Sequence, residues 1–307
     1  MLSRVAERVY WMSRYLERVE NTARLVAVYG ELLLDLPDEA QLDWSVPLRI
    51  LGMEDSYQSL GDGGDALEFL LSSDRNPAAL KASLAHAREN TRTTRDVVPS
   101  EAWRAINELY LHAAEHLSDR AQRPGSRIPG DIVRRCHEIT GILEGTMSHG
   151  PAHRFVCLGR SLERADMTSR MIDVAAAILM TGREELRHHD NTVWRAVLRA
   201  LSAYQMYRQY VRRRVEGADV VDFLLHDREF PRSVTFCVDV LDEAVAALPR
   251  GEAAGTRVKP VRDRLKGIDR DAIDHEVVHR FVDDLQVDLA ALHGTIFETW
   301  LNPMRVV

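Results

Sequence analysis

The sequence contains 307 residues, of which 45% are hydrophobic and 28% are charged, and its formal net charge is -7 at neutral pH. These values are typical of a globular protein. Acidic and basic residues are mixed along the whole sequence, so no basic block indicates a nucleic-acid-binding protein and no acidic tail indicates a disordered segment. The length suffices for one large domain or for two domains of ordinary size.

Cysteine usage and hydropathy restrict the cellular setting. The cysteines form no CxxC pair, which excludes a disulfide framework or a thiolate metal cage and favours a reducing compartment. No apolar run is long enough to cross a bilayer, and residues 1–8 lack the apolar core of a signal peptide. We therefore expect a cytoplasmic protein without a membrane or nucleic-acid partner. The cysteines are Cys136, Cys157 and Cys237.

Taken in chain order, the first predicted element is a helix. Its apolar residues recur at steps of 3, 4, 3, 4 and 3, which is the pattern of a helix packed along one seam: Val9, Met12, Leu16, Val19, Ala23 and Val26. Further periodic stretches follow, separated by turn signals at residues 36–38, 61–64, 123–125, 150–151 and 248–251. Alternating strand patterns are scarce. The sequence therefore predicts an all-α fold.

Three segments recur later in the chain in the same order. Residues 14–24 resemble 160–170, residues 69–77 resemble 223–231, and residues 143–147 resemble 292–296. Because the spacings are nearly equal, we interpret them as an internal duplication. It predicts two pseudo-symmetric helical-bundle halves, residues 1–149 and 150–307, packed as one compact body. The second helix carries an equivalent seam at Leu158, Leu162, Ala165, Ser169 and Ile172.

A polar stripe lies beside the seam in both halves. In the first half, small and charged residues follow steps of 4, 3 and 4, which places them on one face of the helix: Ser13, Glu17, Glu20 and Arg24. The second half repeats them as Gly159, Glu163, Asp166 and Arg170, and a basic row adjoins each stripe at Arg14, Arg18, Arg160 and Arg164. The small residues Ser13 and Gly159 would allow another backbone or a ligand to approach closely.

Two interpretations of the stripes remain open. In the structural one, Glu–Arg pairs form a ladder on an exposed helix, each worth about 0.3–0.5 kcal/mol, or are partly buried and set the register of neighbouring helices. In the functional one, they line a pocket for an anionic or zwitterionic ligand such as an amino acid, peptide or nucleotide. Arginines would then bind carboxylate or phosphate, and glutamates an amine or a metal.

The residues around both stripes resemble the bacterial Alpha-E family. The resemblance is carried by residues 6–24, 158–170 and 230–234 and extends over essentially the whole chain. It implies a helical protein, usually duplicated, whose Glu-Arg motif falls here on Glu17-Arg18 and Glu163-Arg164. It also implies partners: members are typically encoded beside, or fused to, circularly permuted ATP-grasp amide ligases, together with transglutaminase-like proteins and NTN-type peptidases.

The expected function is therefore that of a helical component of a peptide synthesis or modification system, which handles substrate or assists the ligase. The alternatives are a stand-alone enzyme acting on an amino acid or peptide, and a non-catalytic scaffold with a purely structural stripe. No catalytic residue can be carried over from the family. The candidate substrate-binding residues are Arg14, Glu17, Arg18, Glu20, Arg24, Arg160, Glu163, Arg164, Asp166 and Arg170.

The histidine motifs do not predict a metal site. Residues 275–279 spell H-E-x-x-H, the signature of zinc proteases, but the first half has no counterpart and no Met-turn follows. We interpret His149 and His153, which flank the Gly150-Pro151 junction, as junction residues rather than ligands. With no P-loop and no G-x-G-x-x-G after a strand, we expect no cofactor bound by this chain itself.

Overall fold

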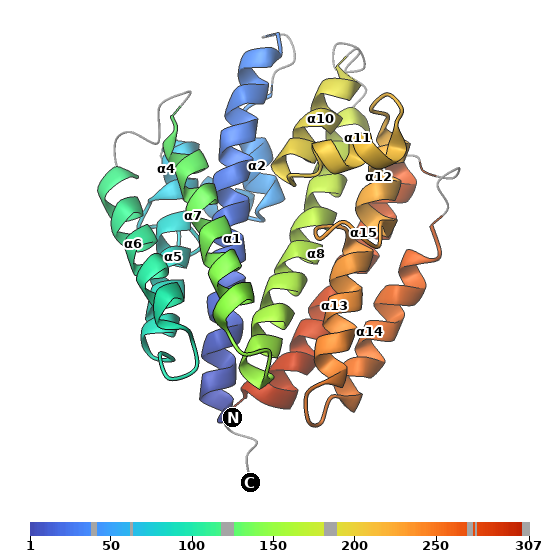
Figure 1. Cartoon of the computed structure of the whole chain (residues 1–307). Helices are drawn as coiled ribbons and strands as arrows, with labels where there is room; N and C mark the ends of the chain where they lie inside the picture. The colour runs from blue at the N-terminus through green and yellow to red at the C-terminus, as the bar shows by residue number, and fades with distance from the viewer. Residues whose placement is uncertain are drawn as a thin grey trace.

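The computed structural model describes residues 1–37, 42–61, 64–117, 126–180, 189–268, 273 and 275–302, apart from the side chains of residues 180 and 275. These parts of the chain are helical and contain no strand, which confirms the predicted all-α fold (Figure 1). The first half comprises α1 (Ser3–Asp35), α2 (Ser45–Ile50), α3 (Glu54–Gln58), α4 (Ala66–Leu71), α5 (Leu80–Arg92), α6 (Ser100–His116) and α7 (Ile128–Thr146). The second comprises α8 (Pro151–Met180), α10 (Asp190–Ala200), α11 (Tyr204–Val211), α12 (Gly217–His226), α13 (Val234–Ala246), α14 (Glu252–Leu265), α15 (His275–Ile296) and the π-helical turn η3 (Phe297–Leu301).

The long helices α1 and α8 pack against each other in the centre of the molecule (Figure 1). The predicted seams of both helices are buried, as the apolar periodicity requires. Residues outside the seam are also buried, because neighbouring helices cover the other faces of α1. Every residue from Val19 to Val26 is buried. Within the described residues, no helix has the combination of length and apolarity that a membrane span needs.

The outer helices pack in the same order around each central helix. In the first half α1 packs on α5 and α7, and α6 lies against both of these; in the second half α8 packs on α13 and α15, and α14 lies against both. One continuous apolar core joins the two sets, so they form one compact body. The internal duplication and the boundary after residue 149 stay predictions; that boundary falls between the end of α7 at Thr146 and the start of α8 at Pro151.

The two central helices approach each other closely at a position where both carry a small residue. A Cβ atom added to Gly159 would lie 2.4 Å from the carbonyl oxygen of Tyr10 and 3.1 Å from Cβ of Ser13. The Ser13 hydroxyl donates a hydrogen bond of 2.7 Å to the carbonyl oxygen of Val156. Of the two uses considered for these small residues, close approach of a second backbone is the one observed.

We predict that Gly159→Ala destabilises the protein by about 1–3 kcal/mol, because the new methyl group meets backbone that cannot rotate away. The free energy of unfolding from urea denaturation measures the effect. Gly141→Ala in α7 is the matched control, since a Cβ there meets nothing within 4 Å. This control should gain about 0.5–1 kcal/mol from helix propensity alone. Equal effects of the two substitutions would contradict the close approach.

Candidate functional site

The packing of α1 on α8 brings charged residues of the two stripes together in the interior. We call this group the α1–α8 charge cluster. It is held between the two helices, with one further side chain from the turn before α13. Its members are Arg14, Glu17, Arg18, Glu20, Arg24, Glu163, Arg164 and Arg232.

The Glu-Arg motifs of the two helices pair with each other. Glu163 Oε1 accepts a hydrogen bond of 2.7 Å from Nε of Arg18, and Glu17 Oε2 forms an ion pair of 3.0 Å with Nε of Arg164. Each glutamate therefore pairs with the motif arginine of the other helix, as expected of a self-complementary interface. The exposed-ladder interpretation is wrong for these residues, since both glutamates are buried and their pairs cross between helices.

Glu163 remains ionised although its side chain is only 4% exposed. Its Oε2 accepts a second hydrogen bond, of 2.7 Å, from Nε of Arg14. Burial raises the pKa of this carboxyl group, but the charges and hydrogen bonds of Arg14 and Arg18 outweigh burial and lower the pKa to about 2. The carboxylate is thus held in its charged form by two guanidinium groups.

Arg232 is a member that reasoning from helix periodicity missed. Its Nη1 donates to Glu17 Oε1 at 2.7 Å and to Asn21 Oδ1 at 2.8 Å, and its Nη2 donates to Glu20. Its own carbonyl oxygen accepts a 2.8 Å hydrogen bond from Thr168 of α8, which anchors the turn. Periodicity along α1 and α8 cannot reveal a side chain that comes from a distant turn. The sequence feature that could have identified Arg232 is the family-like segment 230–234.

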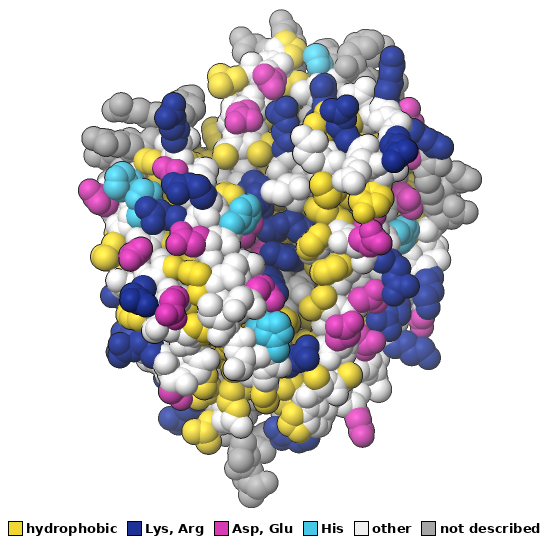
Figure 2. Space-filling view, viewed as in Figure 1, with side chains coloured by type: hydrophobic (Ala, Val, Ile, Leu, Met, Phe, Trp, Pro, Cys, Tyr) yellow, Lys and Arg dark blue, Asp and Glu magenta, His cyan; other side chains and the backbone are white. Residues whose placement is uncertain are grey.

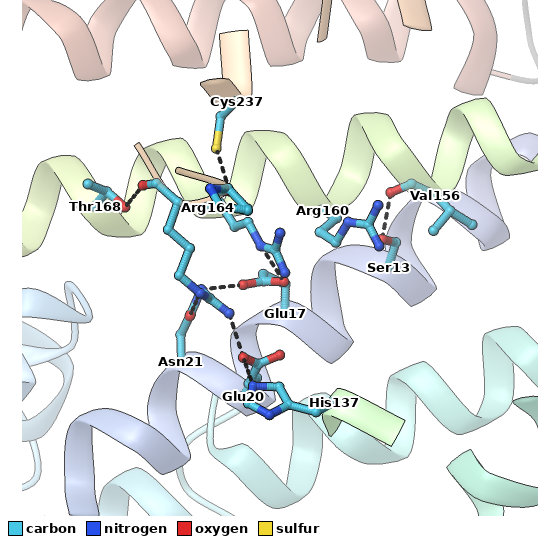
Figure 3. Close-up of polar contacts among 12 residues, drawn as sticks. Ser13, Glu17, Glu20, Asn21, His137, Val156, Arg160, Arg164, Thr168 and Cys237 are labelled. Carbon is cyan, nitrogen blue, oxygen red and sulfur yellow. Dashed lines mark hydrogen bonds and ion pairs between the residues drawn. The ribbon is translucent and has the colours of Figure 1, made fainter. Parts of the chain in front are cut away.

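The Glu20 end of the cluster reaches solvent through α7. Glu20 is paired with Arg24 and Arg232, and its Oε1 lies 3.1 Å from Nε2 of His137, whose side chain is 57% exposed (Figure 3). Burial raises the pKa of Glu20, but Arg232, the hydrogen bond of His137 and Arg24 lower it well below its usual range. The same His137 nitrogen lies 2.9 Å from Nη2 of Arg24. A partly exposed imidazole therefore contacts both of these groups.

Positive charge exceeds negative charge in the cluster. Among the described residues, five guanidinium groups face three glutamates in these ion pairs. Two buried donor atoms, Nη1 of Arg24 and Nδ2 of Asn21, have no hydrogen-bond acceptor. Figure 2 shows a hollow near the middle of this face, with Lys and Arg side chains at its floor. Buried positive charge and unpaired donors are unfavourable, and a bound anion would stabilise both.

Three of the ten predicted site residues lie outside the cluster. Arg160 binds Glu144 of α7, and Asp166 pairs at 2.9 Å with Arg170, four residues along α8. In the predicted duplication, the position that holds Arg232 after Pro231 corresponds to Ala78 after Pro77, which has no charged side chain.

The remaining candidate motifs serve other contacts. His279 of the H-E-x-x-H string lies on α15 with Nδ1 2.5 Å from Oδ1 of Asp173, while the side chain of His275 lies outside the described residues. All three cysteines are free and buried. A pocket between α13 and α14 is lined in part by Asp239 and Arg262, which already pair at 2.9 Å.

Comparison with known proteins identifies the class. A model of the Alpha-E family, described as a predicted alpha-helical domain with a conserved ER motif, matches residues 1–301. The chain therefore belongs to the Alpha-E family, and the reciprocal Glu17–Arg164 and Glu163–Arg18 pairs show how both Glu-Arg motifs are used in its fold.

The chain is similar to an uncharacterised protein of Mycobacterium bovis and to two of Mycobacterium tuberculosis strains. Each is 24% identical over 316 residues, an alignment that covers 94% of this chain and 34% of the relative. The chain thus spans about a third of the length of the curated relatives it matches. No solved structure matches it.

We predict that Glu163→Gln destabilises the protein at pH 7 by about 3–5 kcal/mol, because it leaves Arg14 and Arg18 without their buried counter-ion. Chemical denaturation measures the loss. The control is Asp166→Asn, which removes the more exposed pair with Arg170 and should cost about 1 kcal/mol or less. Similar losses in both variants would contradict a special role for the buried pairs.

We also predict a loss of stability in acid that depends on Glu163. Its pKa in the folded protein is lowered, so the stabilisation is present above the ordinary carboxyl pKa and is lost as the pH falls from about 4.5 towards about 2. The shift corresponds to about 3 kcal/mol. The unfolding free energy of Glu163→Gln should therefore fall less steeply in this range than that of the unmodified protein. Parallel pH profiles would show that the carboxylate is not responsible.

Proposed function

We propose that the α1–α8 charge cluster binds the carboxylate or phosphate group of a peptide-type substrate, and that the chain is a substrate-handling component of an ATP-grasp-dependent amide ligation system. The observation that carries the proposal is the buried excess of guanidinium groups. Guanidinium groups bind carboxylate and phosphate in a planar, bidentate geometry, and they do so more strongly where water is excluded.

The unused donors indicate where the anion would bind. Nη1 of Arg24 and Nδ2 of Asn21 lie on the same helix, three residues apart, and neither has an acceptor. An anion beside them would satisfy both donors and offset the positive charge. The half-exposed His137 next to Arg24 supports access from the α7 side, where displacement of one imidazole would open the cluster to solvent.

The partners in this proposal come from the family resemblance. They are a circularly permuted ATP-grasp ligase and transglutaminase-like proteins. Amide ligation consumes a carboxylate, which matches the ligand class that the cluster favours. This chain has no familiar nucleotide-binding loop motif, so we assign the ATP chemistry to the ligase. The greater length of the mycobacterial relatives is compatible with a domain that works beside others in one chain.

A structural role is the alternative that has an observation in its favour. The reciprocal Glu17–Arg164 and Glu163–Arg18 pairs would hold α1 against α8 without any ligand. The two roles differ at Arg24, because Glu20 keeps Arg232 and His137 as partners when Arg24 is replaced. Arg24 therefore allows binding to be tested with little effect on the helix interface. A stand-alone enzyme would instead show turnover without a ligase.

The test is Arg24→Gln, measured in two assays. In the first, inorganic phosphate at constant ionic strength should raise the melting temperature of the unmodified protein and not that of the variant. In the second, ADP release by the reconstituted ligase system in the presence of its carboxylate and amine substrates should fall about 10–100-fold, as expected for a lost charged hydrogen bond.

Arg170→Gln is the matched control, since Arg170 is the equivalent residue of α8 and lies outside the cluster. It should retain the phosphate response and activity within about twofold. If Arg24→Gln lowers stability but leaves the phosphate response and the activity unchanged, the cluster is purely structural and the proposal is wrong.

A further inference from the structure

Three side chains with metal-binding atoms converge where α7 turns into α8. They are Glu144 in the last turn of α7, His149 in the connection and His153 in the first turn of α8, and one ligand atom from each lies within 4.8 Å of the others. Figure 2 shows histidine side chains on this face near the junction of the two helices seen in Figure 1. Neither the family comparison nor the proposed function assigns a role to this group.

The His153 side chain is oriented for metal binding. It is only 4% exposed, and its Nε2 atom has no hydrogen-bond partner, although it lies 3.4 Å from Oε2 of Glu144. Its other nitrogen, Nδ1, lies 3.6 Å from the sulfur of Cys157. With a proton on Nδ1 directed at this sulfur, Nε2 is the nitrogen that would bind a metal, in place of the proton it shares with Glu144.

The other two side chains lie beside His153. The ring of His149 is stacked on that of His153 with centroids 4.0 Å apart, and its Nε2 lies 3.2 Å from the backbone oxygen of Glu144. Oε1 of Glu144 is bound by Arg160, which leaves Oε2 facing His153. These outer contacts resemble the carboxylate and histidine supports that orient ligands around protein-bound metals.

The sequence alone favoured His149 and His153 as junction residues, but their geometry leads us to propose that they and Glu144 bind a divalent transition metal. Zn²⁺ is the ion that fits best. Two imidazoles and one carboxylate are a common ligand set of zinc, and three protein ligands leave a fourth tetrahedral position open. The exposed side chains of Glu144 and His149 can rotate to bring their atoms to the required distance of about 2 Å from the metal. The bound ion would fasten the connection between α7 and α8.

A second group in the described residues is a poorer candidate. Asp173, His279 and Asp283 also lie close together, but they offer a single imidazole. His279 already forms its 2.5 Å contact with Asp173. We therefore expect one tight zinc site per chain rather than two.

The experiment uses the full-length protein after dialysis against a chelator. Zn²⁺ is titrated in competition with a chromophoric chelator, and Co²⁺ is used to record the visible spectrum of the bound ion. We expect one equivalent of Zn²⁺, a tetrahedral Co²⁺ spectrum and a higher melting temperature with zinc. His149→Ala and Glu144→Gln alter exposed side chains and should each weaken binding about 100-fold or more, as loss of a ligand costs at least as much as loss of an outer support.

The matched control is the His112/His116 pair of α6. These rings are also four residues apart and stacked, with centroids 4.5 Å apart, but they belong to neither metal-type group found among the described residues. His112→Ala with His116→Ala should leave zinc binding unchanged. The proposal is overturned if the folded protein binds no stoichiometric zinc, or if binding survives in His149→Ala and Glu144→Gln. Neither result bears on anion binding at Arg24, which is measured without metal.

Discussion

The structure depends on reciprocal ion pairs between α1 and α8. Glu17 pairs with Arg164, and Glu163 pairs with Arg18, so each helix neutralises charges of the other. Removal of four charged groups from water is costly, and the cost is offset only while both helices supply their partners. The close approach at Gly159 makes this possible, since it brings the two backbones near enough for the side chains to meet. Small residues and charged residues are therefore parts of one interface.

One additional arginine gives this interface an excess of positive charge. Paired glutamates and arginines alone would leave little net charge at the centre. Arg232 enters from the turn before α13 and binds both Glu17 and Glu20. Its counterpart in the predicted duplication is the uncharged Ala78. The added guanidinium group shares carboxylates that other arginines already use. Burial lowers the pKa of Arg232, and the carboxylates of Glu17 and Glu20 act in the opposite direction.

Sequence periodicity predicted the helices and the buried seams because residues at steps of three and four share a face whatever that face contacts. The same rule grouped Glu17, Glu20 and Arg24 correctly on one side of α1. It could not predict that this side is buried, since burial is decided by α7, α8 and the turn before α13. Arg232 and His137 lie more than a hundred residues from α1 in sequence, and their contacts arise only from tertiary packing.

The structural role of the cluster and its proposed binding role are compatible because they use different atoms. The motif glutamates are occupied by interhelical pairs, whereas Nη1 of Arg24 and Nδ2 of Asn21 remain available beside them. An anion bound to these donors would reduce the repulsion among the five guanidinium groups and so stabilise the packing of α1 on α8. Ligand binding and the strength of the helix interface are then linked.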